Sequence, residues 1–241
     1  MEMLSQSRLP SIERGALELA NKRIVTAKEF YRLARNAQHS GLFTISGKTK
    51  KAIEKVQDAI IELTEDRGLS LRGFSAKVDG VFDKSNLGQA HMELVYRNTV
   101  QSMFSDGIDE THELDVVKRT FPYVRYVAIH DVRARETHLA LEKLGIQGTD
   151  IYRADDPVIK LFRPPWEWNC RCGRIFLTTK QAANSGIREA EECLKRGVHP
   201  FDIDNPAYVK MPPFRPPPGW NTGKRTAGRL RQQVAGAWSD T

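Results

Sequence analysis

The chain has 241 residues, of which 40% are hydrophobic, which is enough for one sizeable domain or two small ones. Its net charge of +7 leaves two interpretations open, an acidic partner such as nucleic acid or a charge that only aids solubility. No apolar run approaches the roughly 18 residues of a membrane span, and charges interrupt the N-terminal region, so we expect neither a membrane span nor a signal peptide. Three cysteines with this spacing do not form a disulfide framework, which favours a reducing cytoplasm.

The N-terminal third of the sequence predicts helices. Apolar residues recur at helical spacing over 11–38, where Thr26 and Glu29 match a capping box, and this predicts one bent helix or two short ones. A second helix is predicted over 49–67, with Gly68 as its end. Its apolar face consists of Ile53, Val56, Ile60 and Leu63. The glycine-punctuated residues 68–83 predict a loop or a weak hairpin.

The middle of the chain predicts a long helix over 86–106 with Gly107 as its C-cap. The residues that fall near one face of this helix are Leu87, Ala90, Leu94, Asn98, Gln101 and Phe104. A shorter helix over 111–119 should end before Pro122. Further elements follow in alternation. They are strands over 123–129 and 174–177, a helix over 137–144, a helix opened by a Thr178–Gln181 capping box, and a helix over 187–196.

These elements predict an α+β fold, with N-terminal helices, a small β-sheet with packed helices, and an extended Pro-rich basic C-terminal arm. The predicted divisions are a helical region over 1–84, a mixed domain over 85–198 and the arm over 199–241. Seven of the twelve prolines lie in the arm, which forbids helix and central strand there. Six basic residues of the arm are candidate contacts to nucleic acid or a protein partner: Lys210, Arg215, Lys224, Arg225, Arg229 and Arg231.

Cys170 and Cys172 lie two residues apart, so on a strand both side chains would face the same side and reach one soft metal ion. His138 is the candidate third ligand, and His130 or Asp131 would complete a tetrahedral zinc site. The competing interpretation makes the two thiols small buried groups that pack beneath Trp166 and Trp168.

Two further motifs each allow a structural and a functional interpretation. Asp131, Arg133, Arg135 and His138 form a polar cluster that serves either as a general base with an anion clamp or as an internal network in which Asp131 pairs with one of the arginines. The network is the preferred interpretation, because no nucleophile with a matching base stands out. The two tryptophans of 164–169 either anchor a partner or alternate so that both are buried.

Four of these motifs, taken in order, resemble the Mu F-like family of tailed-phage head-morphogenesis proteins, also called minor capsid or minor head proteins. They are VYRNTVQSMFSDG at 95–107, YVRYVAIHDVRARETH at 123–138, ADDP at 154–157 and PPWEWNCRCGRIFL at 164–177. The resemblance covers about residues 86–182. Where many relatives place a second histidine between PP and CRC, this chain has Glu167, which removes a preferred zinc ligand and offers an oxygen instead.

The resemblance implies a structural component of the virion head, present in few copies, that assembles in the host cytoplasm and is not an enzyme. Its expected partners are the portal or the major capsid protein, with packaged double-stranded DNA as a further partner during packaging or ejection. Two alternatives stay open. One is a metal-dependent nuclease or toxin-like enzyme domain, and the other is a DNA-binding module without sequence specificity.

Overall fold

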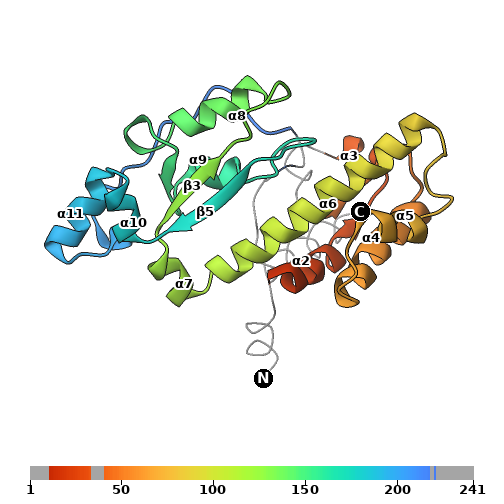
Figure 1. Ribbon diagram of the computed structural model, residues 1–241, viewed down its shortest axis with the longest axis horizontal. Coiled ribbons are helices and arrows are strands. Elements are labelled where there is room, and N and C mark those ends of the chain that lie inside the picture. Colours follow the sequence, from red (N-terminus) through yellow and green to blue (C-terminus); the bar gives the residue numbers. More distant parts are fainter. Residues whose placement is uncertain (1–10, 34–40, 218–219, 221–241) are drawn as a thin grey trace.

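The computed structural model describes residues 11–33, 41–217 and 220, and the statements below concern these residues. A long central helix, α6 (Asn86–His112), runs between a cluster of helices on one side and a small sheet with its own helices on the other (Figure 1). The fold is α+β, as the sequence predicts. Within the described part of the chain, no helix combines the length and apolar character that crossing a membrane requires.

The helical cluster consists of α2 (Ser11–Ala20), α3 (Ala27–Arg32), α4 (Lys50–Glu65) and α5 (Leu71–Lys77). The predicted N-terminal helix is two short helices, and the predicted capping box is present, with Thr26 and Glu29 each accepting from the other's backbone N–H. Strand β1 (Arg23–Ile24) lies between them and pairs in parallel with β2 (Leu42–Phe43). Residues 34–38 of the predicted helix lie outside the described residues. Helix α4 buries the predicted face.

Residues 68–83 contain a helix, α5, so the predicted loop or hairpin is wrong. Ser70 caps this helix by accepting a hydrogen bond from the backbone N–H of Gly73. Phe74 and Val78, four residues apart, are 0% and 1% exposed and pack into the core of the helical cluster. Three glycines obscure this pattern in the sequence, because glycine is a poor helix former and usually marks turns.

The long helix also departs from its prediction. It continues through Gly107 to His112, so Gly107 is a buried helical residue and not a C-cap. Leu87 and Phe104 of the predicted face are 84% and 48% exposed, whereas Asn98 of that face is buried, as are Val95, Met103 and Asp106. The predicted face is therefore only partly the buried one. The prediction fails in part because α6 lies between two layers and buries polar as well as apolar residues.

Helix α7 (Asp115–Thr120) follows α6 and ends before Pro122, as predicted. The sheet has three antiparallel strands in the order β4-β3-β5. Strand β3 (Tyr123–Val127) is central and pairs with β5 (Gly173–Leu177), both close to their predicted bounds. The sequence analysis missed β4 (Ile151–Arg153), because three residues are too few to show an alternating pattern.

The helices of the sheet layer are α8 (Glu136–Ala140), which continues as a 3-10 turn over Leu141–Lys143, then α9 (Pro157–Leu161), α10 (Thr179–Asn184) and α11 (Arg188–Arg196). Two more 3-10 turns lie at Ile146–Gly148 and Pro200–Asp202. The Thr178–Gln181 capping box that opens α10 is confirmed. Residues 203–217 have no regular secondary structure and lie on the sheet layer, where Val209, Met211 and Phe214 pack against its core.

Polar side chains of α6 hold the two layers together. Asp106 accepts from Lys22 (3.1 Å) in the helical cluster and from Arg163 (2.6 Å) in the sheet layer. Asp109 accepts from Arg163 at 2.9 Å and from Arg174 at 2.8 Å. Asp106 and Arg163 are buried, and the side chains of Lys22, Asp109 and Arg174 are only 10% to 16% exposed, so pairing offsets a substantial desolvation cost.

The packing of α5 predicts that two substitutions in this helix change the free energy of unfolding by different amounts. Phe74→Ala should lower the free energy of unfolding by about 3 to 5 kcal/mol, because it leaves a cavity in the helical core. Leu71→Ala, which alters an exposed side chain of the same helix, should change it by less than about 1 kcal/mol. Urea unfolding followed by circular dichroism measures both. Equal effects would contradict the burial of Phe74.

Candidate functional site

His138, Cys170 and Cys172 come together in the core of the sheet layer, as the sequence predicts. His138 lies on α8, and the two cysteines lie in the irregular segment that leads into β5. The Nδ1 atom of His138 is 3.2 Å from Cys172 Sγ and 3.7 Å from Cys170 Sγ. The three ligand atoms lie within 4.8 Å of one another, and all three residues are buried.

The other side of the imidazole ring is also occupied. His138 Nε2 lies 3.1 Å from Glu167 Oε2, so the ring stands between a carboxylate and two thiols. The indole of Trp166 stacks on the imidazole, with ring centroids 3.9 Å apart, and its Nε1 donates to the Tyr126 hydroxyl at 3.0 Å. Glu167 also forms an ion pair with Arg135, with a nitrogen–oxygen distance of 3.5 Å. These contacts fix the orientation of His138.

The pKa values of the two thiols are shifted in opposite directions. The side chains of Cys170, His138 and Tyr126 around Cys172 lower the pKa of its thiol, and burial opposes them. The hydrogen bond to Cys172 and burial raise the pKa of Cys170. The Tyr126 pKa is raised by burial and by the negative charge of Cys172.

His130 and Asp131, the predicted alternatives for a fourth ligand, do not join the cluster. His130 is largely exposed and contacts Glu142 at 2.5 Å. Asp131 pairs with Arg171 at 2.7 Å, which holds the pKa of the Asp131 carboxyl well below its ordinary value. The predicted pairing with Arg133 is present only through the backbone N–H of Arg133, and the guanidinium that pairs with Asp131 is that of Arg171. A partner forty positions away in the sequence cannot be recognised from local spacing.

The rest of the predicted polar cluster divides between two places. Arg133 donates its backbone N–H to Asp131 at 2.9 Å and is exposed. Arg135 donates to the Trp168 carbonyl at 3.0 Å. Trp166 is buried, whereas Trp168 is 47% exposed and contacts Trp220, so the interpretation in which both indoles are buried does not hold. The residues between the prolines and the cysteines form a turn with Asn169 at a positive φ, and not an alternating strand.

The predicted contact residues of the arm are described only in part. Lys210 and Arg215 are exposed, and Arg215 donates to the Phe214 carbonyl at 2.8 Å. Lys224, Arg225, Arg229 and Arg231 lie outside the described residues.

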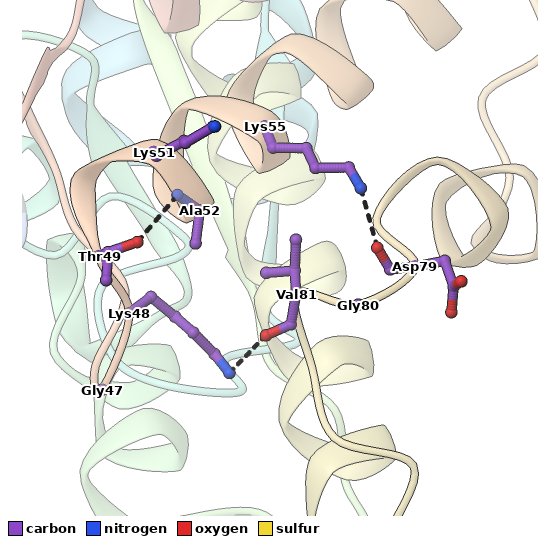
Figure 2. Close-up of a pocket in the computed structure, with 9 residues that line it drawn as sticks. All are labelled: Gly47, Lys48, Thr49, Lys51, Ala52, Lys55, Asp79, Gly80 and Val81. Atoms are coloured by element: carbon purple, nitrogen blue, oxygen red, sulfur yellow. Dashed lines mark hydrogen bonds between the residues drawn. The ribbon is translucent and has the colours of Figure 1, made fainter.

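A basic hollow that the sequence analysis did not single out lies at the start of α4 (Figure 2). It has a volume of about 450 Å³ and is lined by Lys48, Lys51 and Lys55 together with residues 79–81. Two of these lysines serve the fold, because Lys48 donates to the Val81 carbonyl at 2.7 Å and Lys55 to the Asp79 carbonyl at 2.8 Å. The hollow thus lies where these hydrogen bonds attach the 79–81 loop to the start of α4.

Comparison with known proteins agrees with this arrangement. The family model described as "Phage Mu protein F like protein" matches residues 46–175, more than half of the chain. The chain belongs to this family. The match includes α4 and α5 and spans the whole of α6, so it begins well before the motifs that carry the resemblance in the sequence. It ends within β5, just after the cysteine pair.

The Mu-like prophage FluMu F protein of Haemophilus influenzae is 51% identical to the chain over 67 residues. That alignment covers 28% of this chain and 15% of the relative, so the chain spans only a small part of that protein's length. No solved structure matches the chain. Phage Mu F-like proteins are a family of phage head-morphogenesis proteins, generally structural ones.

Two Arg–Asp pairs in this layer should differ sharply in their contribution to stability. Arg163→Met should lower the free energy of unfolding by about 3 kcal/mol, because it leaves the buried carboxylates of Asp106 and Asp109 with fewer partners. Arg171→Met removes a partly exposed pair and should have a far smaller effect. Chemical unfolding of both variants tests this. A larger loss for Arg171→Met would show that the buried network does not join the layers.

Proposed function

We propose that this protein is a minor structural component of a tailed-phage head. It acts in procapsid assembly at the portal vertex or the capsid interior, and it remains in the virion. The observation that carries this proposal is the family match over residues 46–175, which covers the central helix and most of the sheet layer. The proposed role is structural and not catalytic, with the portal or the major capsid protein as partner.

The internal contacts support a structural role. The charged groups expected of an enzyme site are committed to contacts within the protein, with Asp131 held by Arg171 and the ring of His138 held between Glu167 and the cysteines. The buried ion pairs along α6 join the two layers into one unit. A protein that serves as a fixed part of a larger shell needs this kind of rigidity.

The proposal predicts incorporation into heads. In cells that assemble the phage, the full chain should co-sediment with procapsids and crosslink to the portal or the major capsid protein. A matched chain with Arg163→Met, which weakens the joint between the layers, should be incorporated less efficiently than one with Arg171→Met. Absence of the chain from both procapsids and virions would contradict a role in the head.

The arm is the proposed contact to packaged DNA. Over residues 210–231 it carries six basic and no acidic residues, a composition suited to phosphate contacts without base reading. Described members of this set, Lys210 and Arg215, are exposed beside the sheet layer.

Binding to random-sequence duplex DNA should weaken steeply with salt, with a slope near −0.9 for each phosphate contact. The triple variant Arg225→Gln, Arg229→Gln and Arg231→Gln should reduce the size of that slope by roughly 2 to 3. The control Lys51→Gln, Lys84→Gln and Lys143→Gln removes the same charge from exposed lysines elsewhere and should leave the slope close to that of the unmodified chain. Fluorescence anisotropy measures both. Equal changes would show that total charge, and not the arm, determines binding.

The same preparations test the enzymatic alternative. Cleavage of DNA by the full chain, lost in His138→Ala and Asp131→Ala while both variants stay folded, would replace the structural proposal by a nuclease. The described geometry does not favour this outcome, because His138 and Asp131 belong to separate sets of contacts.

A further inference from the structure

We infer that His138, Cys170 and Cys172 bind a zinc ion and that Glu167 is a positioning residue behind the histidine. The inference rests on the geometry of four side chains in the sheet layer and does not depend on the proposed role in the phage head. It extends the sequence-based expectation in one respect. Glu167 is assigned to the far side of the imidazole, and not to the ion.

The distances in the cluster match those of a tetrahedral site. With a zinc–sulfur bond of about 2.3 Å and a zinc–nitrogen bond of about 2.0 Å, tetrahedral geometry separates sulfur from nitrogen by about 3.5 Å. The two observed separations from His138 Nδ1 are 3.2 and 3.7 Å, on either side of that value. One ion can therefore reach both thiolates and the imidazole with only small shifts of the side chains.

The contact with Glu167 prepares the histidine for this role. A carboxylate only accepts hydrogen bonds, so His138 Nε2 must carry the proton that points to Glu167 Oε2 at 3.1 Å. The lone pair of the neutral ring then lies on Nδ1, which faces the two sulfur atoms. Carboxylate contacts of this kind set the tautomer of metal-binding histidines and increase their basicity. Arg135, at 3.5 Å, helps to hold the carboxylate in place.

The type of ligand and the burial both favour a metal over a nucleophilic thiol. Two thiolates and one imidazole form a soft ligand set that suits zinc. A nucleophile must meet its substrate, but Cys170 and Cys172 are 2% and 5% exposed and lie under the indole of Trp166, which stacks on His138. The described residues supply three of the four ligands of a tetrahedral ion.

Such an ion would connect two segments that are distant in the sequence. His138 belongs to α8, whereas the cysteines precede β5, which pairs with the central strand β3. Binding would therefore hold α8 against the edge of the sheet and add its binding energy to the stability of this layer. Structural zinc sites in small domains act in the same way.

The first test measures metal content. The full chain, purified with zinc present and then desalted, should contain about one zinc per chain by elemental analysis. Cys172→Ser and His138→Ala should each lose it, whereas Cys193→Ser, which alters the third buried cysteine outside the cluster, should retain it. Zinc content that stays the same in Cys172→Ser would overturn the inference.

A second test uses the unmodified chain and does not require a ligand variant to fold. Cobalt(II) added to the metal-free protein should produce thiolate-to-cobalt charge-transfer absorption and the strong visible bands of four-coordinate cobalt, and zinc should displace both. Absence of these bands in a folded chain would overturn the inference. So would rapid alkylation of Cys172 by iodoacetamide that zinc does not slow, which would instead identify a reactive thiol.

The role of Glu167 is tested in the same assay. Glu167→Ala should weaken zinc binding by about 10-fold to 100-fold while leaving the cobalt spectrum unchanged, because the ligand set stays the same. Glu167→Gln keeps an oxygen that accepts from His138 Nε2 and should restore most of the affinity. A cobalt spectrum altered by Glu167→Ala would show that Glu167 is a ligand, which would contradict the positioning role.

Discussion

The buried pairing of Asp106 and Asp109 with cations from both layers is the interaction on which the rest of the structure depends. The two carboxylates lie less than a turn apart near the C-terminal end of α6, with Asp106 buried and Asp109 largely covered. Lys22 reaches Asp106 from the helical cluster, whereas Arg163 and Arg174 come from the sheet layer. Burial of carboxylates requires all of these partners at once. The network thus places the segment that carries the cysteines against α6.

Hydrogen bonds between uncharged groups also connect α6 to the segment that carries the candidate metal site. Gln101 donates to the Cys172 carbonyl at 3.0 Å, and Asn98 accepts from the backbone N–H of Asn169 at 3.1 Å. Ser105 donates to the Pro164 carbonyl at 2.6 Å. Residues 164–172 have no strand partners of their own, so α6 supplies the contacts that a sheet would otherwise provide. The positions of the two thiols therefore follow from the packing of a helix some seventy residues earlier in the chain.

Local signals in the sequence were sufficient where structure is local. Both capping boxes and the apolar face of α4 were predicted correctly, because their partners lie three or four residues apart. The end of α6 was not predicted correctly. Gly107 is a typical stop signal, and only distant arginines explain why the helix continues beyond it. The pair of Asp131 and Arg171 could not be predicted either, because its members lie 40 residues apart in the sequence. Strand β4 could not be predicted because it is too short to show an alternating pattern. Spacing brought His138 and the cysteine pair together correctly, whereas the position of Glu167 required the fold.

Residues 203–217 have the extended, proline-rich character predicted for the arm, but the structure attaches them to the sheet layer. Val209 donates its backbone N–H to Asp156 at 2.8 Å, and Phe214 packs edge-on against Phe162. Phe214 also stacks at 6.4 Å from Trp166, the residue that covers His138. This segment therefore adds a layer of apolar side chains over the candidate metal site. Burial of the two cysteines depends on packing from α6 on one side and from this segment on the other, which is why neither their motif nor their spacing alone could establish it.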